Sequence, residues 1–175
     1  MARTDRIANT WDAPAGLARG VLGGVVDQAK NYNDAEIGIL YNNNINTVKF
    51  VRNQGYVMWG QKTAQRVQSA LDRINVRRLL IYIENTLEPL LLSFLFELNT
   101  DKLRSRVTNI VDNFMRSVKS GDGVTAYQVV CNDTNNSALD IDNHLLNVDL
   151  YVQPAQSIEF IQMRVTVTRT GVSFQ

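Results

Sequence analysis

The sequence has 175 residues, of which 45% are hydrophobic, and its 18 Lys and Arg against 17 Asp and Glu leave a net charge of +1. This length and composition predict one folded domain and exclude both general disorder and a polycation built to wrap nucleic acid. A single Cys and a single His exclude a disulfide-stapled scaffold and are too few for the ligand set of a Cys/His zinc site.

The N-terminal third of the chain predicts an extended lead-in, a short helix and a hairpin. The expected elements, in chain order, are a lead-in at 1–20, a strand at 21–26, a helix at 34–41, and strands at 47–51 and 56–59. Asn33 or Asp34 suits the N-cap of the helix, because a short side-chain oxygen can accept from the first free N–H groups. Residues 53–55, Asn-Gln-Gly, indicate a tight turn between the two strands.

Two amphipathic helices are expected in the middle of the chain. Apolar residues recur at helical spacing from 73 to about 87 and again from 101 to 119, after Asn99 or Thr100 as the N-cap. The predicted buried stripe of the second helix is Leu103, Val107, Ile110, Val111, Phe114, Met115 and Val118.

The segment between these helices is strongly apolar. Pro89 should kink or restart the first helix, and the apolar run 90–96 should be deeply buried. Glu84 and Glu88 interrupt the stretch, so it is not expected to span a membrane, and the polar N-terminus has no secretory signal. The sequence therefore predicts a soluble protein without membrane insertion, made in a reducing cytoplasm.

The C-terminal third is rich in strands, which makes the whole chain α+β. The expected elements are a strand at 124–131, a short helix at 137–143, and strands at 146–152 and 158–168. Charge is uneven: residues 62–119 hold ten basic and six acidic groups, whereas 120–160 hold six acidic and no basic groups. This separation suits a molecule that packs against its own copies or a charged partner, although ordinary solvated faces give the same pattern.

No group of residues has the spacing of a known reaction centre. Cys131 and His144 could form a nucleophile and base, but no feature brings them together, and Cys131 ends an apolar strand. Asp140, Asp142 and His144 lack the remaining ligands of a calcium loop. The sequence predicts no enzyme, metal or cofactor and no direct nucleic-acid contact; the alternative is a small soluble α+β enzyme that uses Cys131 and His144.

Several segments, in order and over roughly residues 14–170, resemble the C-terminal part of contractile phage tail sheath proteins, most closely those of large myoviruses related to phage T4. The resemblance is carried by Asn44-Ile-Asn46, by residues 55–63, by residues 74–84, by residues 96–99, by Val130-Cys-Asn-Asp133 and by Asp140-Ile-Asp-Asn143. The matching motif positions are Trp59, Gly60, Lys62, Thr63, Asn75, Arg77, Arg78, Tyr82, Glu84, Phe96, Glu97 and Asn99. Lys62 stands where the family usually has Arg, and Leu98 stands where it has Pro.

The resemblance implies a structural part without chemistry. It implies a small mixed sheet packed against two main helices and completed by terminal arms of neighbouring subunits. The expected layout is a lead-in from an upstream region at 1–20, an inner, tube-facing domain at 21–157, and a terminal strand and arm at 158–175. The expected partners are other sheath subunits, the tail tube protein, the baseplate and the tail terminator, in a virion assembled in the bacterial host cytoplasm. A tailocin or type VI secretion sheath is the alternative within the class.

Two sets of contact residues follow from the resemblance. The arm that joins a neighbour's sheet is expected to use Ile158, Phe160, Ile161, Met163, Val165, Val167, Val172 and Phe174, with an ordinary strand within the same chain as the alternative. Contact with an acidic tube is expected on the solvated face of the second helix, at Lys102, Arg106 and Arg116.

Overall fold

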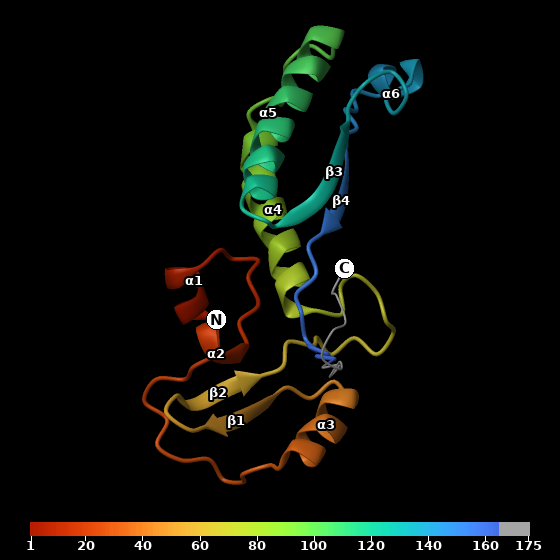
Figure 1. Cartoon of the computed structure of the whole chain (residues 1–175). Helices are drawn as coiled ribbons and strands as arrows, with labels where there is room; N and C mark the ends of the chain where they lie inside the picture. The colour runs from red at the N-terminus through yellow and green to blue at the C-terminus, as the bar shows by residue number, and fades with distance from the viewer. Residues whose placement is uncertain (165–175) are drawn as a thin grey trace, which may run out of the picture.

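The computed structural model describes residues 1–164, which form two bodies joined by one long helix (Figure 1). The hairpin body contains α1 (Ala2–Ile7), α2 (Gly16–Arg19), α3 (Asp34–Asn42), β1 (Thr47–Val51) and β2 (Gly55–Trp59). The helical body contains α4 (Ile74–Leu92), α5 (Asp101–Ser120), β3 (Val124–Val130), α6 (Ala138–Asp142) and β4 (Asp149–Pro154). The predicted α+β class is confirmed.

The hairpin body follows the local signals of its sequence. Asn33 caps α3 through a capping box, in which its side chain accepts from the Glu36 N–H and the Glu36 carboxylate accepts from the Asn33 N–H. The predicted turn joins β1 and β2, with Asn53 and Gly55 both at positive φ. The predicted strand at 21–26 is wrong: only Val21 forms a bridge, to Val57, because Gly23 and Gly24 turn the chain directly afterwards.

Residues 1–20 do not form an extended lead-in, because α1 and α2 fold back onto the rest of the chain. Asp5 of α1 forms an ion pair with Arg78 of α4. The Trp11 indole N–H donates to the Gly121 carbonyl at 2.8 Å, and its ring meets that of Tyr82 edge-on at 5.4 Å. The polar composition of residues 1–20 gave no sign of this packing, because its partners are about 70 to 110 residues away in the sequence.

The long helix α4 corrects two expectations. It runs without a break through Pro89, since the carbonyl of Asn85 that loses its hydrogen bond lies on the exposed side. The apolar run 90–96 is not deeply buried: Phe94 is buried, whereas Phe96 is fully exposed. Helix α4 ends at Leu92, so the rest of the run forms the turn into α5 at the tip of the helical body.

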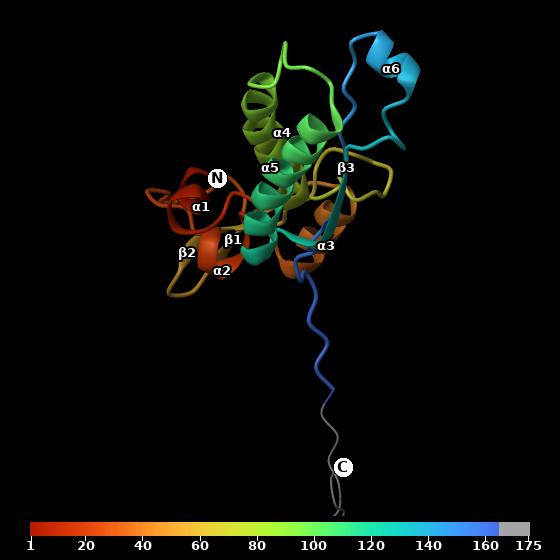
Figure 2. The same ribbon diagram turned by 90° about the horizontal axis from the view of Figure 1, so that it is seen from above.

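The main core lies between α4, α5 and the β3–β4 sheet, which the two views show side by side (Figure 2). Residues of the predicted α5 stripe are buried as expected, apart from Ile110 and Phe114, which are half-buried at its margin. From α4 and the sheet, the core receives Leu79, Ile83, Leu87, Val124 and Cys131.

The strands form two separate antiparallel pairs instead of the single mixed sheet that was expected. β1 pairs with β2, and β3 pairs with β4 with a bulge between Val124 and Ala126. The predicted strand at 146–152 begins later, at Asp149. Residues 155–164 belong to no strand and lead away from the helical body (Figure 2), while the remainder of the predicted strand at 158–168 lies outside the described residues.

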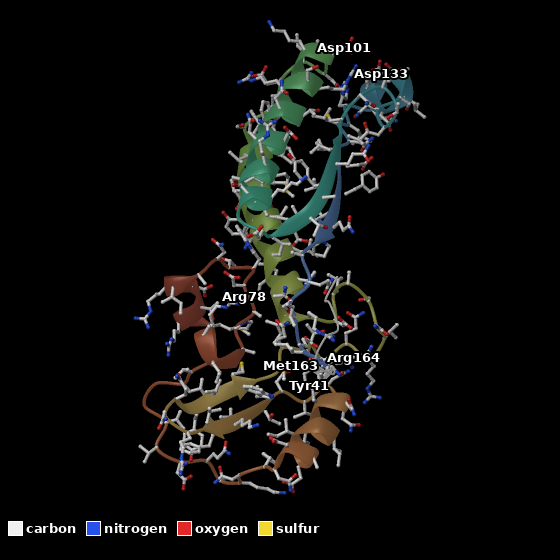
Figure 3. The ribbon with its side chains drawn as sticks, viewed as in Figure 1. Tyr41, Arg78, Asp101, Asp133, Met163 and Arg164 are labelled. Carbon is white, nitrogen blue, oxygen red and sulfur yellow. The ribbon has the colours of Figure 1, made fainter. Side chains whose placement is uncertain are left out.

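Arg104 is a buried cation that ties the start of α5 to the loop before α6. Its guanidinium donates to Asn99 Oδ1 at 2.9 Å, to Asp133 Oδ1 at 2.8 Å and to Asp101. Asp101 and Asp133 accordingly lie at the same end of the helical body (Figure 3). No local pattern in the sequence connects Arg104 with Asp133, because the two residues are 29 positions apart along the chain.

Gly60 offers a first test of the fold. Its φ is +143°, and an added Cβ would lie 2.7 Å from Asn46 Oδ1, which accepts the Lys62 N–H at 2.8 Å. We expect Gly60→Ala to lower the free energy of unfolding by about 1–3 kcal/mol in urea denaturation. The control is Gly38→Ala inside α3, where nothing lies within 4 Å, so helix propensity should raise stability slightly. Equal effects of the two substitutions would contradict this account of Gly60.

Arg104 offers a second test. Arg104→Met keeps the aliphatic stem and removes the hydrogen bonds, so we expect a loss of about 1–2 kcal/mol, limited because Asp101 and Asp133 can be solvated. Arg106→Met, on the exposed face of the same helix, should change stability by less than about 0.5 kcal/mol. Thermal unfolding followed by circular dichroism measures both, and a similar Tm for the two variants would refute the structural role of Arg104.

Candidate functional site

A cluster of polar side chains holds the segment after β4 against the hairpin body. The Glu159 carboxylate accepts from Arg73 Nε at 2.6 Å and Arg73 Nη2 at 3.0 Å, from the Tyr41 hydroxyl at 2.5 Å, and from Gln61 Nε2 at 3.3 Å. Tyr41 belongs to α3, Gln61 follows β2, and Arg73 precedes α4. We call these four residues the Glu159 cluster; it joins three elements to the end of the described chain.

The protonation of the cluster follows from its contacts. Burial by itself would raise the pKa of Glu159, but the hydrogen bonds from Arg73, Tyr41 and Gln61 outweigh it and bring the pKa below its usual range. Burial and the bond to Glu159 raise the pKa of Tyr41, so its hydroxyl remains a donor. The cluster at neutral pH is therefore a carboxylate bound by a cation and neutral donors.

Beside this cluster is a groove of about 430 Å³ between α2, α3 and the hairpin. Its walls include Ile37 of α3, Trp59 of β2, and Ile158 and Phe160 of the terminal segment. The Phe160 ring meets that of Tyr41 edge-on at 6.4 Å. The groove therefore combines apolar walls with the charged cluster at one end.

The predicted arm residues within the described chain are largely exposed. Ile158 is 83% exposed, Phe160 76%, Ile161 87% and Met163 84%. Val165, Val167, Val172 and Phe174 lie outside the described residues. Four apolar side chains in one short segment contribute little to the core of their own chain, so their apolar surface is available to a partner.

The hairpin has one open edge within the described part of the chain. β2 bonds β1 on one side and the segment around Val21 on the other, where the Leu22 N–H donates to the Tyr56 carbonyl at 2.8 Å. β1, across residues 1–164, pairs with β2 alone. Its outer backbone groups are thus geometrically able to accept another strand.

The three cations expected to meet a tube lie on the exposed face of α5. Lys102 and Arg106 form no ion pair with a described residue, and the Arg106 guanidinium lies 5.3 Å from the centre of the Phe94 ring. Arg116 pairs with Asp112 one turn earlier, and this bond raises the pKa of Arg116. Two of these three residues therefore present unpaired charge within the described structure.

The motif positions around the hairpin have structural contacts. Lys62 donates from Nζ to the Tyr41 carbonyl at 2.8 Å, so it binds the C-terminal end of α3. Its ammonium also lies over the Tyr41 ring, 4.3 Å from the centre. Thr63 donates to the Leu71 carbonyl at 3.2 Å, while Trp59 lies under the Lys49 ammonium at 5.2 Å. Lys62 thus provides a cationic contact between the chain after β2 and the end of α3.

Some motif positions on α4 contact other parts of the chain, and others are exposed to solvent. Asn75 is buried at the helix start, and Arg78 pairs with Asp5. The Tyr82 ring lies between Trp11 and Phe114, with centroid distances of 5.4 Å and 5.9 Å. Arg77 and Glu84 are exposed. This helix therefore connects the two bodies through Arg78 and Tyr82.

The motif positions after α4 form the tip of the helical body. Asn99 donates to the Leu145 carbonyl at 2.9 Å and accepts from Arg104. Phe96 has a φ of +69° and is fully exposed beside the exposed Glu97. The hydrogen bonds of Asn99 thus stabilise the turn between α4 and α5, and this turn leaves the Phe96 side chain exposed to solvent.

The residues of the enzyme alternative do not form a reaction centre. Cys131 is buried in the core, and burial raises the pKa of its thiol, which disfavours the thiolate. His144 lies exposed in the turn after α6. Within residues 1–164, no three His, Cys, Asp or Glu side chains gather closely enough to hold a metal ion. None of the helices described is both long and apolar enough to cross a membrane.

Sequence reasoning missed the Glu159 cluster. Glu159 and Arg73 are 86 positions apart, and Glu159 and Tyr41 are 118 apart, so no local spacing connects them. The one available signal was the single charge at Glu159 within the apolar residues 158–161. An isolated carboxylate in such a segment indicates a specific partner without identifying it.

Comparison with known sequences gives a consistent result. The profile of the phage tail sheath C-terminal domain matches residues 66–168. The tail sheath protein of Enterobacteria phage T4 is 38% identical and that of Vibrio phage KVP40 37% identical, each over 173 residues and 99% of this chain. The chain spans about a quarter of the length of these relatives, 26% in both cases.

Solved structures agree on the fold. The anti-feeding prophage baseplate structure contains a chain with a TM-score of 0.85 and 23% identity, matching 95% of this chain and 47% of that one. The sheath complex of the extracellular contractile injection system PVC, in its contracted state, gives 0.85 and 23% over 93% of this chain and 47% of that one. With the family profile over more than half its length and tail sheath relatives across nearly all of it, this chain belongs to the phage tail sheath C-terminal domain family.

Proposed function

We propose that this chain is the inner, tube-facing domain of a tail sheath subunit. The complete subunit polymerises around the tail tube and contracts to drive the tube through the host envelope for genome delivery. The observation that carries this proposal is the match of 99% of the chain to phage tail sheath proteins at 37% and 38% identity. The identity to contractile injection systems is lower, at 23%, which favours a phage tail over a tailocin or secretion sheath.

The work of the domain is mechanical under this proposal. Its partners are neighbouring sheath subunits, the tail tube protein, the baseplate and the tail terminator, in a virion assembled in the host cytoplasm. The buried Cys131 thiol and the exposed His144 support a role without catalysis or direct nucleic-acid contact. In this proposal residues 158–175 are the terminal arm, and the domain proper is 21–157 together with α1 and α2, which pack against it.

Electron microscopy tests the proposed function. The complete gene product, expressed together with its tube protein, should form rings or tubes visible in negative stain. A monomer that turns over a substrate would instead support the enzyme alternative, and Cys131→Ser would then abolish the turnover.

The arm is proposed to add a strand to the sheet of a neighbouring subunit. Backbone hydrogen bonds would supply the strength of this contact, and alternate side chains would set its register. Two features support this role: the apolar residues from Ile158 to Met163 are exposed, and the outer edge of β1 is open within the described chain. Both sides of the contact are thus present on one subunit, which permits a continuous chain of subunits.

Substitution within the arm tests this contact. Ile161→Asp with Met163→Asp should abolish tube formation in the complete gene product, because two carboxylates would be forced into an apolar interface. Gln162→Asp, which adds a charge at an already polar exposed position between them, should reduce assembly far less. Tubes of normal length and number from the double variant would refute the arm, and its unchanged Tm would confirm that the subunit still folds.

The exposed face of α5 is proposed to contact an acidic tube. Lys102 and Arg106 carry this role, supported by their exposure and by the absence of an ion pair to either from residues 1–164. Arg116 contributes less in this proposal, because Asp112 already neutralises it. Exposed charge pairs are individually weak and are screened by salt, so the contact can be released on contraction.

Charge reversal tests this surface. Lys102→Glu with Arg106→Glu should reduce the amount of sheath that co-sediments with tubes, and wild-type binding should fall as ionic strength rises. Lys119→Glu on another side of the same helix is the control and should leave co-sedimentation near wild type. Unchanged binding by the double variant at low salt would exclude this face from the tube contact.

A further inference from the structure

We propose that Glu159 is a positioning residue: its carboxylate, held by Arg73, Tyr41 and Gln61, fastens the root of the terminal segment (residues 157–160) to the hairpin body and sets the direction in which residues 161–164 leave it. The fastening stands on the contacts of this chain alone. Its consequence for assembly rests on the arm proposed above.

Main-chain hydrogen bonding does not hold this segment in place. The Ala155 N–H donates to the Gly123 carbonyl at 3.1 Å, directly after β4. From residue 156 to residue 164, no backbone group forms a backbone hydrogen bond with another described residue. The position of the root must therefore come from side chains.

Apolar burial contributes little to the fastening. The apolar side chains of Ile158, Phe160 and Ile161 are all more than three-quarters exposed. The Glu159 side chain is the contrast, with 15% exposure. A carboxylate that is more buried than its apolar neighbours indicates that polar contacts decide where the segment lies.

The main chain that carries Gln61 and Arg73, and the orientation of the Arg73 guanidinium, have contacts that do not involve Glu159. The Ile74 N–H donates to the Gln61 carbonyl at 2.8 Å, and Lys62 bridges Arg73, so the main chain sets Gln61 beside Arg73. Asp72 pairs with Arg73 Nη1 at 3.0 Å, which leaves Nε and Nη2 for Glu159. Because the main chain around Gln61 and Arg73 is already ordered, little conformational freedom is lost when the carboxylate binds.

The cluster also determines where the chain leaves the body. Ser157 contacts Gln61 just before Glu159, and Phe160 packs on Tyr41 just after it. The root therefore runs from the start of α4, beside Arg73, to the side of the groove that is formed by α3. The arm residues that follow depart from this side, and loss of the cluster would leave their direction undefined.

A spin label reports the fastening directly. Met163→Cys is labelled in the complete chain, where Cys131 is buried and should stay unmodified. Glu159→Gln keeps the size of the side chain but removes its charge, so we expect about a tenfold rise in the ratio of mobile to immobile label. Tyr41→Phe keeps the ring and should give a smaller rise. Glu88→Gln, an exposed carboxylate on α4, is the control and should match wild type.

The pH profile separates positioning from general stability. The charged and titratable groups around Glu159 are Arg73 and Asp72 before α4, Lys62 after β2, and Tyr41 of α3. Because the folded pKa of Glu159 lies below its ordinary value of 4.5, the fastening should persist above that pH and be lost as the pH falls through the lowered pKa. Label mobility at position 163 should therefore rise as the pH falls. This acid-induced rise should remain in Asp72→Asn and be absent in Glu159→Gln.

The outcomes distinguish the two proposals. Equal label mobility in Glu159→Gln and wild type, or the same acid transition in both, would overturn the role of Glu159. A freed label in Glu159→Gln together with fewer tubes supports the full proposal, whereas a freed label with normal tubes would overturn its consequence for assembly. If Ile161→Asp with Met163→Asp also assembled normally, the arm itself would fail while the fastening by Glu159 would stand.

Discussion

The burial of one face of α5 is the interaction on which the rest of the structure depends. Val107, Val111, Met115 and Val118 on this face are essentially without solvent contact. They pack with residues of α4 and of the β3–β4 sheet in one apolar cluster. A two-stranded sheet is marginal by itself in water, so β3 and β4 depend on this helix for their stability. The helical body is therefore stabilised chiefly by α5, whose buried face packs against both α4 and the β3–β4 sheet.

The hairpin body is attached to this core by different means. Its polar connections are Arg78 with Asp5, the Trp11 indole N–H with the Gly121 carbonyl, and Arg73 with Glu159, and the Trp11 ring also packs against the apolar core. Polar contacts are specific in geometry but contribute less free energy than apolar burial of the same extent. A domain built in this way holds its two bodies in a defined arrangement while keeping most of its stability in one of them.

Exposed apolar side chains gather at two places far apart in the chain. One is the turn after α4, where Leu95, Phe96 and Leu98 are exposed, and the other is the segment from Ile158 to Met163. Clusters of this kind on a protein surface commonly mark contacts with other proteins. The edge of β1 that is open within residues 1–164 adds a third element that can accept a partner. Together these features agree with membership of a family whose members form assemblies, and the terminal segment is the one whose attachment the structure explains.

The sequence by itself determined the features that depend on near neighbours. The capping box at Asn33, the turn at Asn53 to Gly55 and the apolar stripe of α5 all depend on residues within a few positions, so their patterns could be read directly. The family motifs were recognisable for the same reason. Only the tertiary structure decided that α4 continues through Pro89, that the strands separate into two pairs, and that Arg104 and Glu159 are held by distant partners. Each of these depends on which surfaces meet after folding, and contacts across dozens of residues leave no periodic trace in a single sequence.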